Sequence, residues 1–537
     1  MRRRVAGAWD AGPWGLCAAL LFAVTTARAV EQPEREPGWR AEAQAEGFDA
    51  DAEADGRGSG GSGGGEPETS PLEGAGELAG DSGEDSAEAG AVVDSGGGLF
   101  EESLDAPAAI GAGESSLDLG GYVRGDTFIG VLPGTSQPAV QAAYGELALQ
   151  ARARAGAHGD AFGELRMRYG QQLSDRDLFV DLREAYVNAY LGPLDLRLGK
   201  QIVVWGRADA FNPTNNLTPI DFRVRSPVED DRRLGNVGAR AFLNFLPFRL
   251  EGVWMPLYLP TTYPDIQLDD MIVFAEPTFP SRRLEDGLWA TRLHLEAGSF
   301  EASASYLYGA AVLPGFALAG YDVGPEAEIR VSRTAYTHHV VGVDFSTAIG
   351  EAFGLRGEAA YRAPVRWRET LHAPNPDLQY VLGIDRQIGS INVIAQYVGR
   401  YTFDWQERPP PENSDPAQLR GQTEPLAPVV RDAIESALFQ TVANRNQMLF
   451  NQLAQVQHSA SLRLEWLALH ETLSLSALGL VNVTTREWLV FPKLSYHLAD
   501  AMTASVGAEI YSGPDGTLFD MIEESLTAGY AELRLSF

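Results

Sequence analysis

The chain has 537 residues, a formal net charge of −31 at pH 7 and one cysteine. This acidic balance argues against nucleic-acid binding, because contacts with phosphate need clustered Lys and Arg. The sequence contains no phosphate loop and no His-Glu-x-x-His motif, so it does not indicate an enzyme of those classes, a cofactor or a metal site.

The first 29 residues have the pattern of an export signal. Residues 1–4 include three arginines, residues 15–24 form an apolar run, and Ala27-Arg28-Ala29 has the small-x-small pattern of a cleavage site. The apolar run is about half as long as a membrane-spanning helix needs to be. We therefore expect cleavage after Ala29, which also removes Cys17 and leaves a chain without thiols.

Residues 30–116 differ in composition from the rest of the chain. They contain 22 acidic and 3 basic residues, and a nearly pure Gly/Ser run lies at 58–65. A segment with so much charge and so few aromatic residues cannot bury enough apolar surface to fold alone. The sequence predicts a disordered acidic tail here, located in the periplasm, and a folded domain over residues 117–537.

From Leu117 onward, segments of about 10 residues alternate apolar with polar or small side chains and are separated by turns. In one segment, Arg463 and Glu465 alternate with Leu464 and Trp466. This period of two predicts an all-β transmembrane antiparallel barrel of about 18 strands, within a range of 14–18. The strands are expected at 117–130, 141–154, 161–170, 180–191, 194–205, 236–245, 249–257, 287–297, 299–310, 336–348, 352–363, 378–388, 390–403, 456–467, 470–482, 487–498, 501–512 and 528–537.

The links between these segments alternate in length. Tight turns such as Gly192-Pro193 and Gly389-Ser390 alternate with long links such as 206–235 and 404–455. Short periplasmic turns and longer external loops are typical of outer-membrane barrels. The link 171–179 is expected to be long and external, whereas the link near 483–486 departs from the alternation because it is short.

Charged residues of both signs fall on the polar face of the expected strands. A charge on the lipid face of a barrel is costly, so these side chains are expected to point into the lumen. They could set a transverse field that orients polar solutes, or they could pair with one another and stiffen the wall. This lumen charge ladder comprises Arg124, Glu146, Arg152, Glu164, Arg166, Arg168, Asp195, Arg197, Arg292, Arg356, Glu358, Arg463, Glu465, Glu532 and Arg534.

The link after the fifth segment is rich in Asn and Pro. Asn212-Pro213 and Thr218-Pro219 restrict the residue before each proline to extended conformations, and Asn side chains bond to nearby backbone. A rigid loop of this kind could fold inward and narrow the lumen, or it could pack on the external rim. The residues expected to form a pore constriction are Arg207, Asp209, Asn212, Asn215, Asn216 and Asp221.

The stretch 199–222 resembles a segment of a poorly characterised, porin-like family of Gram-negative outer-membrane barrels. In that family a strand ending in a Gly-Lys/Arg-Gln…Trp-Gly pattern leads into an Asn-Pro-rich loop, as Gly199-Lys200-Gln201 and Trp205-Gly206 do here. The close resemblance covers about residues 194–256. It implies a barrel of channel type, without a defined substrate.

The link 404–455 and the last residues of the chain each carry a further signal. In the link 404–455, apolar residues recur at helical spacing over 429–442, which predicts a short amphipathic helix that acts as a lid or caps the rim. The last residues, 529–537, alternate strictly and end on an aromatic side chain. This ending resembles the closing strand of outer-membrane barrels, where the terminal aromatic residue is also an assembly signal. The barrel-closing residues are Tyr530, Leu533, Leu535 and Phe537.

These features together predict a porin-like channel in the outer membrane of a Gram-negative bacterium. The channel would pass small polar or amphiphilic solutes passively, without catalysis, cofactor or metal. The expected partners are outer-membrane lipid and lipopolysaccharide, the barrel-assembly machinery and small solutes. Two alternatives remain open: a structural or adhesive barrel with a plugged lumen, and a barrel-embedded hydrolase. Conductance would separate the first from a channel, and turnover of an acyl ester would identify the second.

Overall fold

The computed structural model describes residues 115–131, 137–172, 175–209, 211–262, 272–322, 328–350, 352–408, 428–515 and 517–537. The expected signal peptide, and the expected tail up to residue 114, lie outside these residues. Within the described ranges, no helix has both the length and the apolar character needed to span a bilayer.

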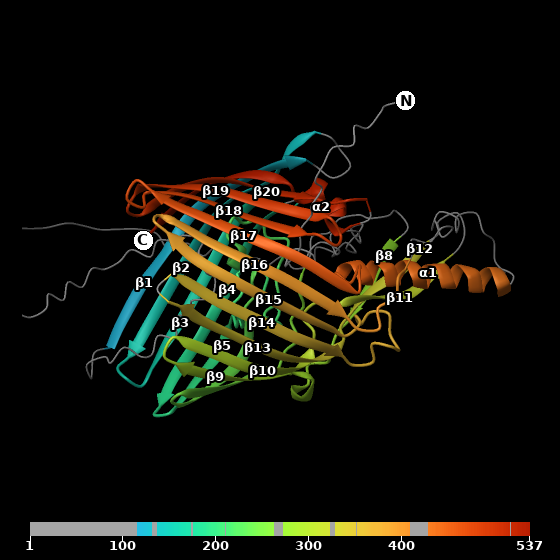
Figure 1. Cartoon of the computed structure of the whole chain (residues 1–537), viewed down its shortest axis with the longest axis horizontal. Helices are drawn as coiled ribbons and strands as arrows, with labels where there is room; N and C mark the ends of the chain where they lie inside the picture. The colour runs from blue at the N-terminus through green and yellow to red at the C-terminus, as the bar shows by residue number, and fades with distance from the viewer. Residues whose placement is uncertain are drawn as a thin grey trace, which may run out of the picture. The chain divides into compact units, whose positions relative to one another are not determined.

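The described residues form one antiparallel sheet of 18 strands that closes into a barrel (Figure 1). Each strand pairs with its neighbours in the sheet, and β1 pairs with both β2 and β21, which closes the ring. The strands are β1 (Ser115–Val131), β2 (Pro138–Ala155), β3 (Gly159–Gln172), β4 (Asp175–Leu191), β5 (Leu194–Gln201), β6 (Asn236–Phe245), β7 (Phe248–Met255), β9 (Leu288–Ala297), β10 (Phe300–Ala310), β13 (Thr337–Ile349), β14 (Phe353–Pro364), β15 (Asp377–Ile388), β16 (Ile391–Thr402), β17 (Val456–Ala468), β18 (Leu473–Asn482), β19 (Glu487–Ala499), β20 (Met502–Ser512) and β21 (Ala528–Ser536).

The predicted barrel and its number of strands are confirmed, but several strand boundaries differ, and two of these differences change the links. The pairing of β3 with β4 continues to Gln172 opposite Asp175, so the expected long link at 171–179 is wrong. β5 ends at Gln201, before the expected end at 205, because its partner β6 begins at Asn236. The residues from Ile202 onward therefore leave the wall earlier than the apolar run Ile202–Val204 suggested.

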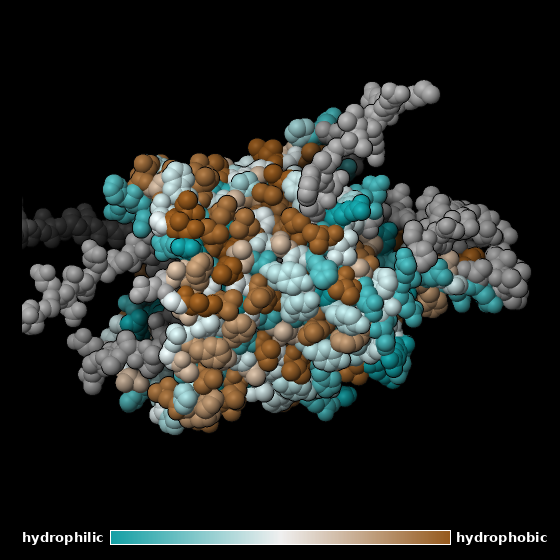
Figure 2. Space-filling model, viewed as in Figure 1, coloured by the Kyte–Doolittle hydropathy of each residue, from teal (hydrophilic) through white to brown (hydrophobic). Residues whose placement is uncertain are grey.

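Side chains alternate between the two faces of the wall. On β17, Leu462 and Leu464 are exposed, whereas Ser461 and Glu465 are buried. Most exposed large apolar side chains of the other strands follow the same alternation, and Figure 2 shows apolar surface spread over the outside of the strands on the side in view. An apolar outer face around a barrel with a charged inner face is the surface of a membrane-spanning β-barrel.

The links at one end of the barrel carry additional structure. β8 (Ile272–Thr278), β11 (Gly315–Asp322) and β12 (Glu328–Thr334) form a separate three-stranded sheet, and Figure 1 shows them near α1 (Pro428–Leu449). α2 (Leu518–Leu526) precedes β21, and two short 3-10 helices, η1 (Glu229–Arg232) and η2 (Leu284–Asp286), lie in other links. The helix expected at 429–442 is present but extends to Leu449, whereas α2 and this small sheet were not predicted.

An apolar cluster joins these elements to the inner wall of β18–β20. Its wall residues Leu480, Leu489 and Tyr511 lie at inward positions. The other members come from α1, α2, β11, β12 and the link after β5, and include Phe222, Phe316, Ile329, Leu438, Val442, Phe519 and Ile522. Because these segments are distant in the sequence, this cluster fixes the link elements on one end of the barrel.

Candidate functional site

The link from Ile202 to Gly235, here called the inner loop, packs against the inner wall of the barrel. Val203, Trp205 and Leu217 belong to one buried apolar cluster with inward side chains of the wall. The Trp205 indole N–H donates to Glu251 Oε1 on β7 at 3.2 Å. The wall members of the cluster are Val253, Met255, Leu288, Ala290, Leu307, Val340 and Ala360, from β7, β9, β10, β13 and β14.

A single carboxylate on β14 binds both sides of the turn at 207–214. The Arg207 backbone N–H donates to Glu358 Oε2 at 2.9 Å, and the Ala208 N–H donates to the same oxygen at 3.2 Å. The Thr214 N–H and hydroxyl donate to Glu358 Oε1 at 2.6 and 2.8 Å. Glu358 therefore holds this part of the inner loop on the wall through four hydrogen bonds.

Charged side chains of the inner loop extend these contacts along the wall. The Arg207 guanidinium binds Asp344 Oδ1 on β13 at 2.8 Å and also contacts Glu301 on β10. Further along the wall, Arg463 Nε on β17 binds Asp209 Oδ2 at 2.8 Å. The segment 203–217 thus contacts the inner wall from β7 to β17.

The turn itself is held together by local hydrogen bonds, as its Asn and Pro content predicted. The Asn216 amide donates to the Pro213 carbonyl at 2.8 Å, and the Asn215 N–H donates to the Asn212 carbonyl at 3.2 Å. Gly206 has a φ of +110°, and a Cβ at this position would overlap the Asn212 side chain. Only glycine fits this backbone geometry without displacing the turn.

The second half of the inner loop binds the opposite part of the wall. Asp231 in η1 accepts hydrogen bonds from Arg124 on β1 and Arg166 on β3, both at 2.6 Å. Burial alone would raise the pKa of Asp231, but the guanidinium groups of Arg124, Arg166 and Arg183 hold it far below its usual range. The three guanidinium groups therefore favour the ionised form of Asp231, which keeps this part of the loop bound to the wall.

Two arginines of the inner loop bind the wall beside this site. Arg225 Nη1 binds Glu509 Oε2 on β20 at 3.0 Å, and Arg232 Nη2 binds Glu509 Oε1 at 2.9 Å. Sequence reasoning assigned no site role to Arg225, Asp231 or Arg232, although residues 230–235 continue the family resemblance. Asp230-Asp231-Arg232-Arg233 was visible as a charged run, but such a run is usually a solvated surface, and its partners are distant in the sequence.

The constriction residues expected from the sequence do not all have the same surroundings. Arg207 and Asp209 bind the wall directly, whereas Asn212 and Asn216 bond within the turn, where Asn215 also lies. Asp221 instead binds Arg223 of the same loop at 2.7 Å, and its backbone pairs with Thr262. Asp221 therefore contributes to the internal structure of the loop.

The charges of the lumen ladder lie at the inward positions of their strands, and many form pairs. The ion pairs include Arg124–Glu146, Arg166–Glu164, Arg168–Glu146, Arg292–Asp344, Arg356–Asp385 and Arg124–Glu532. Other members make different contacts: Arg152 lies over Phe162, Asp195 accepts from Asn244, Arg197 lies over Tyr186, Glu465 accepts from Ser474, and Arg534 lies over Tyr122. Mutual pairing is thus frequent, as the wall-stiffening interpretation requires.

A family model described as "Protein of unknown function (DUF1302)" matches residues 118–228, which span β1 to β5 and most of the inner loop. Comparison with curated proteins gives no match. Among solved structures, the chain is similar to OccK9 (OpdG) of Pseudomonas aeruginosa, with a TM-score of 0.45 and 11% identity over 79% of this chain and 98% of that one.

Two further solved structures show a likeness of the same order. A BenF-like porin from Pseudomonas fluorescens Pf-5 has a TM-score of 0.45 and 12% identity over 79% of this chain and 98% of its own. The outer membrane channel DcaP of Acinetobacter baumannii has a TM-score of 0.35 and 11% identity, over 79% and 97%. Identities of 11–12% do not transfer a function, so we infer the function from the side chains of this chain itself.

The residues expected to close the barrel lie on β21 and at the carboxy-terminus. Leu533, Leu535 and Phe537 are exposed on the outer face, and Tyr530 points inward against Phe128 with ring centroids 5.3 Å apart. The Phe537 N–H donates to the Gly121 carbonyl at 2.9 Å, and the Gly121 N–H donates back at 3.0 Å. The terminal residue is therefore paired with β1 by its backbone while its ring remains exposed.

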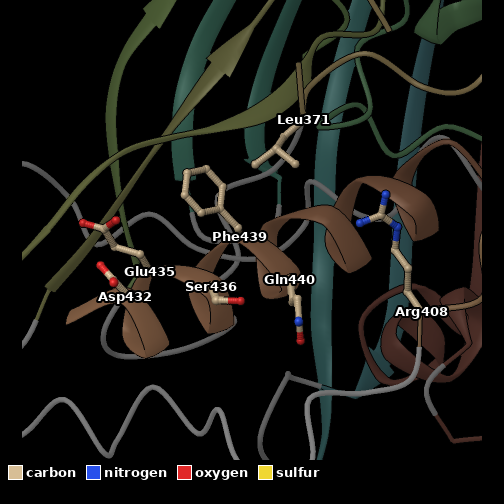
Figure 3. Close-up of a pocket in the computed structure, with 7 residues that line it drawn as sticks. All are labelled: Leu371, Arg408, Asp432, Glu435, Ser436, Phe439 and Gln440. Atoms are coloured by element: carbon tan, nitrogen blue, oxygen red, sulfur yellow. The ribbon is translucent and has the colours of Figure 1, made fainter. Parts of the chain in front are cut away.

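A hollow of about 490 Å³ lies on α1, in the link where the sequence predicted a helix that acts as a lid or caps the rim. Figure 3 shows Phe439 and Leu371 near its centre, Asp432 and Glu435 toward one end and Arg408 toward the other. At its carboxy-terminal end α1 is bound to the wall, because Arg400 of β16 donates to the carbonyls of Phe450 and Asn451. The carboxy-terminal end of α1 is thus fixed to the barrel.

Proposed function

We propose that this chain is an outer-membrane channel of a Gram-negative bacterium that passes small polar or amphiphilic solutes passively. The observation that carries the proposal is the inner loop, which binds β7–β17 through residues 203–217 and β1, β3 and β20 through residues 225–232. A loop held on the inner wall narrows the lumen and places its side chains along the path of a solute. Arg207, Asp209 and Glu358 are the residues we assign to this constriction.

The remaining assignments belong to the same proposal. Residues 1–29 would direct export and be removed, residues 30–116 would form a periplasmic tail, and the barrel would be inserted by the barrel-assembly machinery into lipid and lipopolysaccharide. We assign no catalytic role to the chain. Its inner wall offers alternating charges and hydroxyl groups, which suit transient contact with polar solutes.

Conductance of the purified full chain in a planar bilayer tests the proposal. We expect discrete current steps from protein whose folded state is verified by its heat-dependent mobility on gels. Folded barrels that insert into the bilayer but carry no current would contradict a channel.

One observation favours a second candidate, a barrel with a plugged lumen that serves a structural or adhesive role. The apolar cluster formed by Phe222, α1, α2 and the small sheet covers the inner wall of β18–β20 at the end where the long links lie. Solute-dependent swelling of vesicles that contain the folded protein separates the two, because a plugged barrel would exclude every solute, including those smaller than a monosaccharide.

A further inference from the structure

Part of the inner wall is left uncovered by the inner loop. On β10 and β13–β16, most of the inward side chains level with the loop are buried beneath it. On β18, β19 and β21, the inward side chains below the apolar cluster keep partial exposure to solvent. This open face includes Ser474, Ser476, Lys493, Ser495, Tyr530 and Arg534. Solutes that enter the lumen therefore meet this part of the wall.

Lys493 is the distinctive residue of the open face. It points inward, because Leu494 and Tyr496, one and three positions further along β19, are exposed on the outer face, and it lies opposite Ser476 of β18. Among the described residues its ammonium group makes no ion pair and no hydrogen bond. The only other lysine of the sequence, Lys200, is bound to Asp181 at 2.9 Å.

Glu465 of β17, Glu509 of β20 and Glu532 of β21, which lie near this face, are engaged and buried. Glu509 holds both Arg225 and Arg232, and its side chain is only 8% exposed. Glu532 lies 3.6 Å from Arg124, and Glu465 accepts a hydrogen bond from Ser474. The charge that a solute meets on this face is therefore positive, because the accessible groups are cations and hydroxyls.

Serine residues lie next to Lys493 on the same face of the wall. Ser476 is directly across from Lys493, and Ser495 lies on the same face of β19. The Ser495 hydroxyl is 3.0 Å from that of Ser505 on β20, so hydroxyl groups continue onto the next strand. An ammonium with three donors, flanked by groups that both donate and accept, matches a carboxylate attached to a hydroxylated carbon chain.

We propose that Lys493 and the serines around it form a binding site for small hydroxylated carboxylates, and that this site makes the channel prefer anions. The proposal rests on the channel function proposed above and names its substrate class. Because the ammonium is partly hydrated, it attracts anions without holding them, as conduction requires.

Substitution of Lys493 tests the selectivity. In a KCl gradient we expect the reversal potential of wild type to indicate anion preference, and Lys493→Gln to reduce the anion-to-cation permeability ratio by about threefold. Lys493→Arg should retain the wild-type ratio, since it keeps the charge. Lys200→Gln is the matched control and should also leave the ratio unchanged, because Lys200 shares the outward face of β5 with the exposed Leu198 and its charge therefore lies outside the lumen.

Potassium gluconate and the neutral polyol sorbitol test the ligand class. Gluconate should reduce the chloride current of wild type at lower concentration than it does in Lys493→Gln, whereas sorbitol should affect both proteins equally. If wild type and Lys493→Gln conduct with the same selectivity and the same block by gluconate, the proposed binding site is wrong. The proposed channel function would still stand.

Chemical modification tests the site even if the folded barrel does not conduct, because it does not depend on a current. Lys493 and Lys200 can be modified by an amine-reactive reagent and quantified separately by mass spectrometry. Gluconate should slow the modification of Lys493 and not that of Lys200. Equal rates with and without gluconate would overturn the binding site, whereas absence of conductance contradicts the channel alone.

Discussion

Burying a carboxylate is costly unless cations or hydrogen-bond donors compensate for the lost water. Among the described residues, Glu358 makes no ion pair, and its oxygens are satisfied by the backbone of Arg207, Ala208 and Thr214 and by the Thr214 hydroxyl. The compensation is mutual, because Ala208 and Thr214 are themselves buried. The position of the turn and the burial of this one side chain therefore depend on each other.

We expect Glu358→Ala to release the turn at 207–214 while the barrel remains closed. Each orphaned buried N–H loses about 1–3 kcal/mol of stabilisation, which water in the lumen recovers only if the turn leaves the wall. Single-channel records should show larger and noisier currents. Glu358→Gln keeps one carbonyl oxygen as an acceptor and should give intermediate behaviour. Quiet currents of wild-type size from both variants would mean that Glu358 does not position the loop.

In paired strands, a residue that faces lipid and a residue that faces the lumen can lie at the same depth in the membrane. The same substitution can therefore be compared on the two faces. Leu464 on β17 and Ser476 on β18 are almost level, since Leu464 pairs with Ala477 and Glu465 with Ser476. Leu464 is 41% exposed on the outer face, whereas Ser476 faces the lumen.

We expect Leu464→Arg to destabilise the barrel by about 2–4 kcal/mol if it lies near the bilayer midplane, because it places a charge in lipid. Ser476→Arg should cost far less, since its charge enters the lumen. Urea unfolding in lipid vesicles, followed by tryptophan fluorescence, measures both. The opposite order would place every side chain of this hairpin on the other face, as a register shifted by one residue would.

The inner loop is the element whose removal should change conduction most. Deleting residues 210–218 and joining the ends with a short Gly-Ser link removes Thr214 and Leu217, and with them contacts to Glu358 and to the apolar cluster of Trp205. We expect conductance to rise severalfold while the barrel still forms, as judged by its mobility on gels. Unchanged conductance would locate the narrowest point in the link between β16 and β17 instead.

The strands were predictable because a wall with one apolar and one polar face imposes a period of two on the sequence. The smaller elements lack such a signal. β8 pairs in parallel with β12, a partner in another link, and α2 packs on apolar wall residues such as Tyr511. The same limit applies within the site. Alternation predicts that Glu358 faces inward, but not that it binds Thr214, 144 positions away.

The closure of the molecule involves more than the pairing of its first and last strands. β1 and β21 pair from Tyr122 opposite Ser536 to Gly130 opposite Ala528. The inner loop then joins this seam to the rest of the ring, because Asp231 binds Arg124 of β1 while Asp209 binds Arg463 of β17. Formation of the seam and docking of the loop should therefore be cooperative, and the terminal strand should matter for assembly more than its own contacts imply.

The exposed ring of Phe537 allows its role in assembly to be separated from its role in stability. Its backbone N–H and its terminal oxygen are both hydrogen-bonded to the backbone of Gly121, but its side chain is 61% exposed. Phe537→Ser should therefore leave stability in lipid vesicles almost unchanged, while the amount of folded barrel recovered from the outer membrane of cells should fall markedly. Ser536→Ala, next to it, should alter neither quantity. If Phe537→Ser lowered folding in vesicles and in cells to the same extent, the ring would be needed for the seam itself, and the terminal aromatic residue would not act as a signal for the assembly machinery.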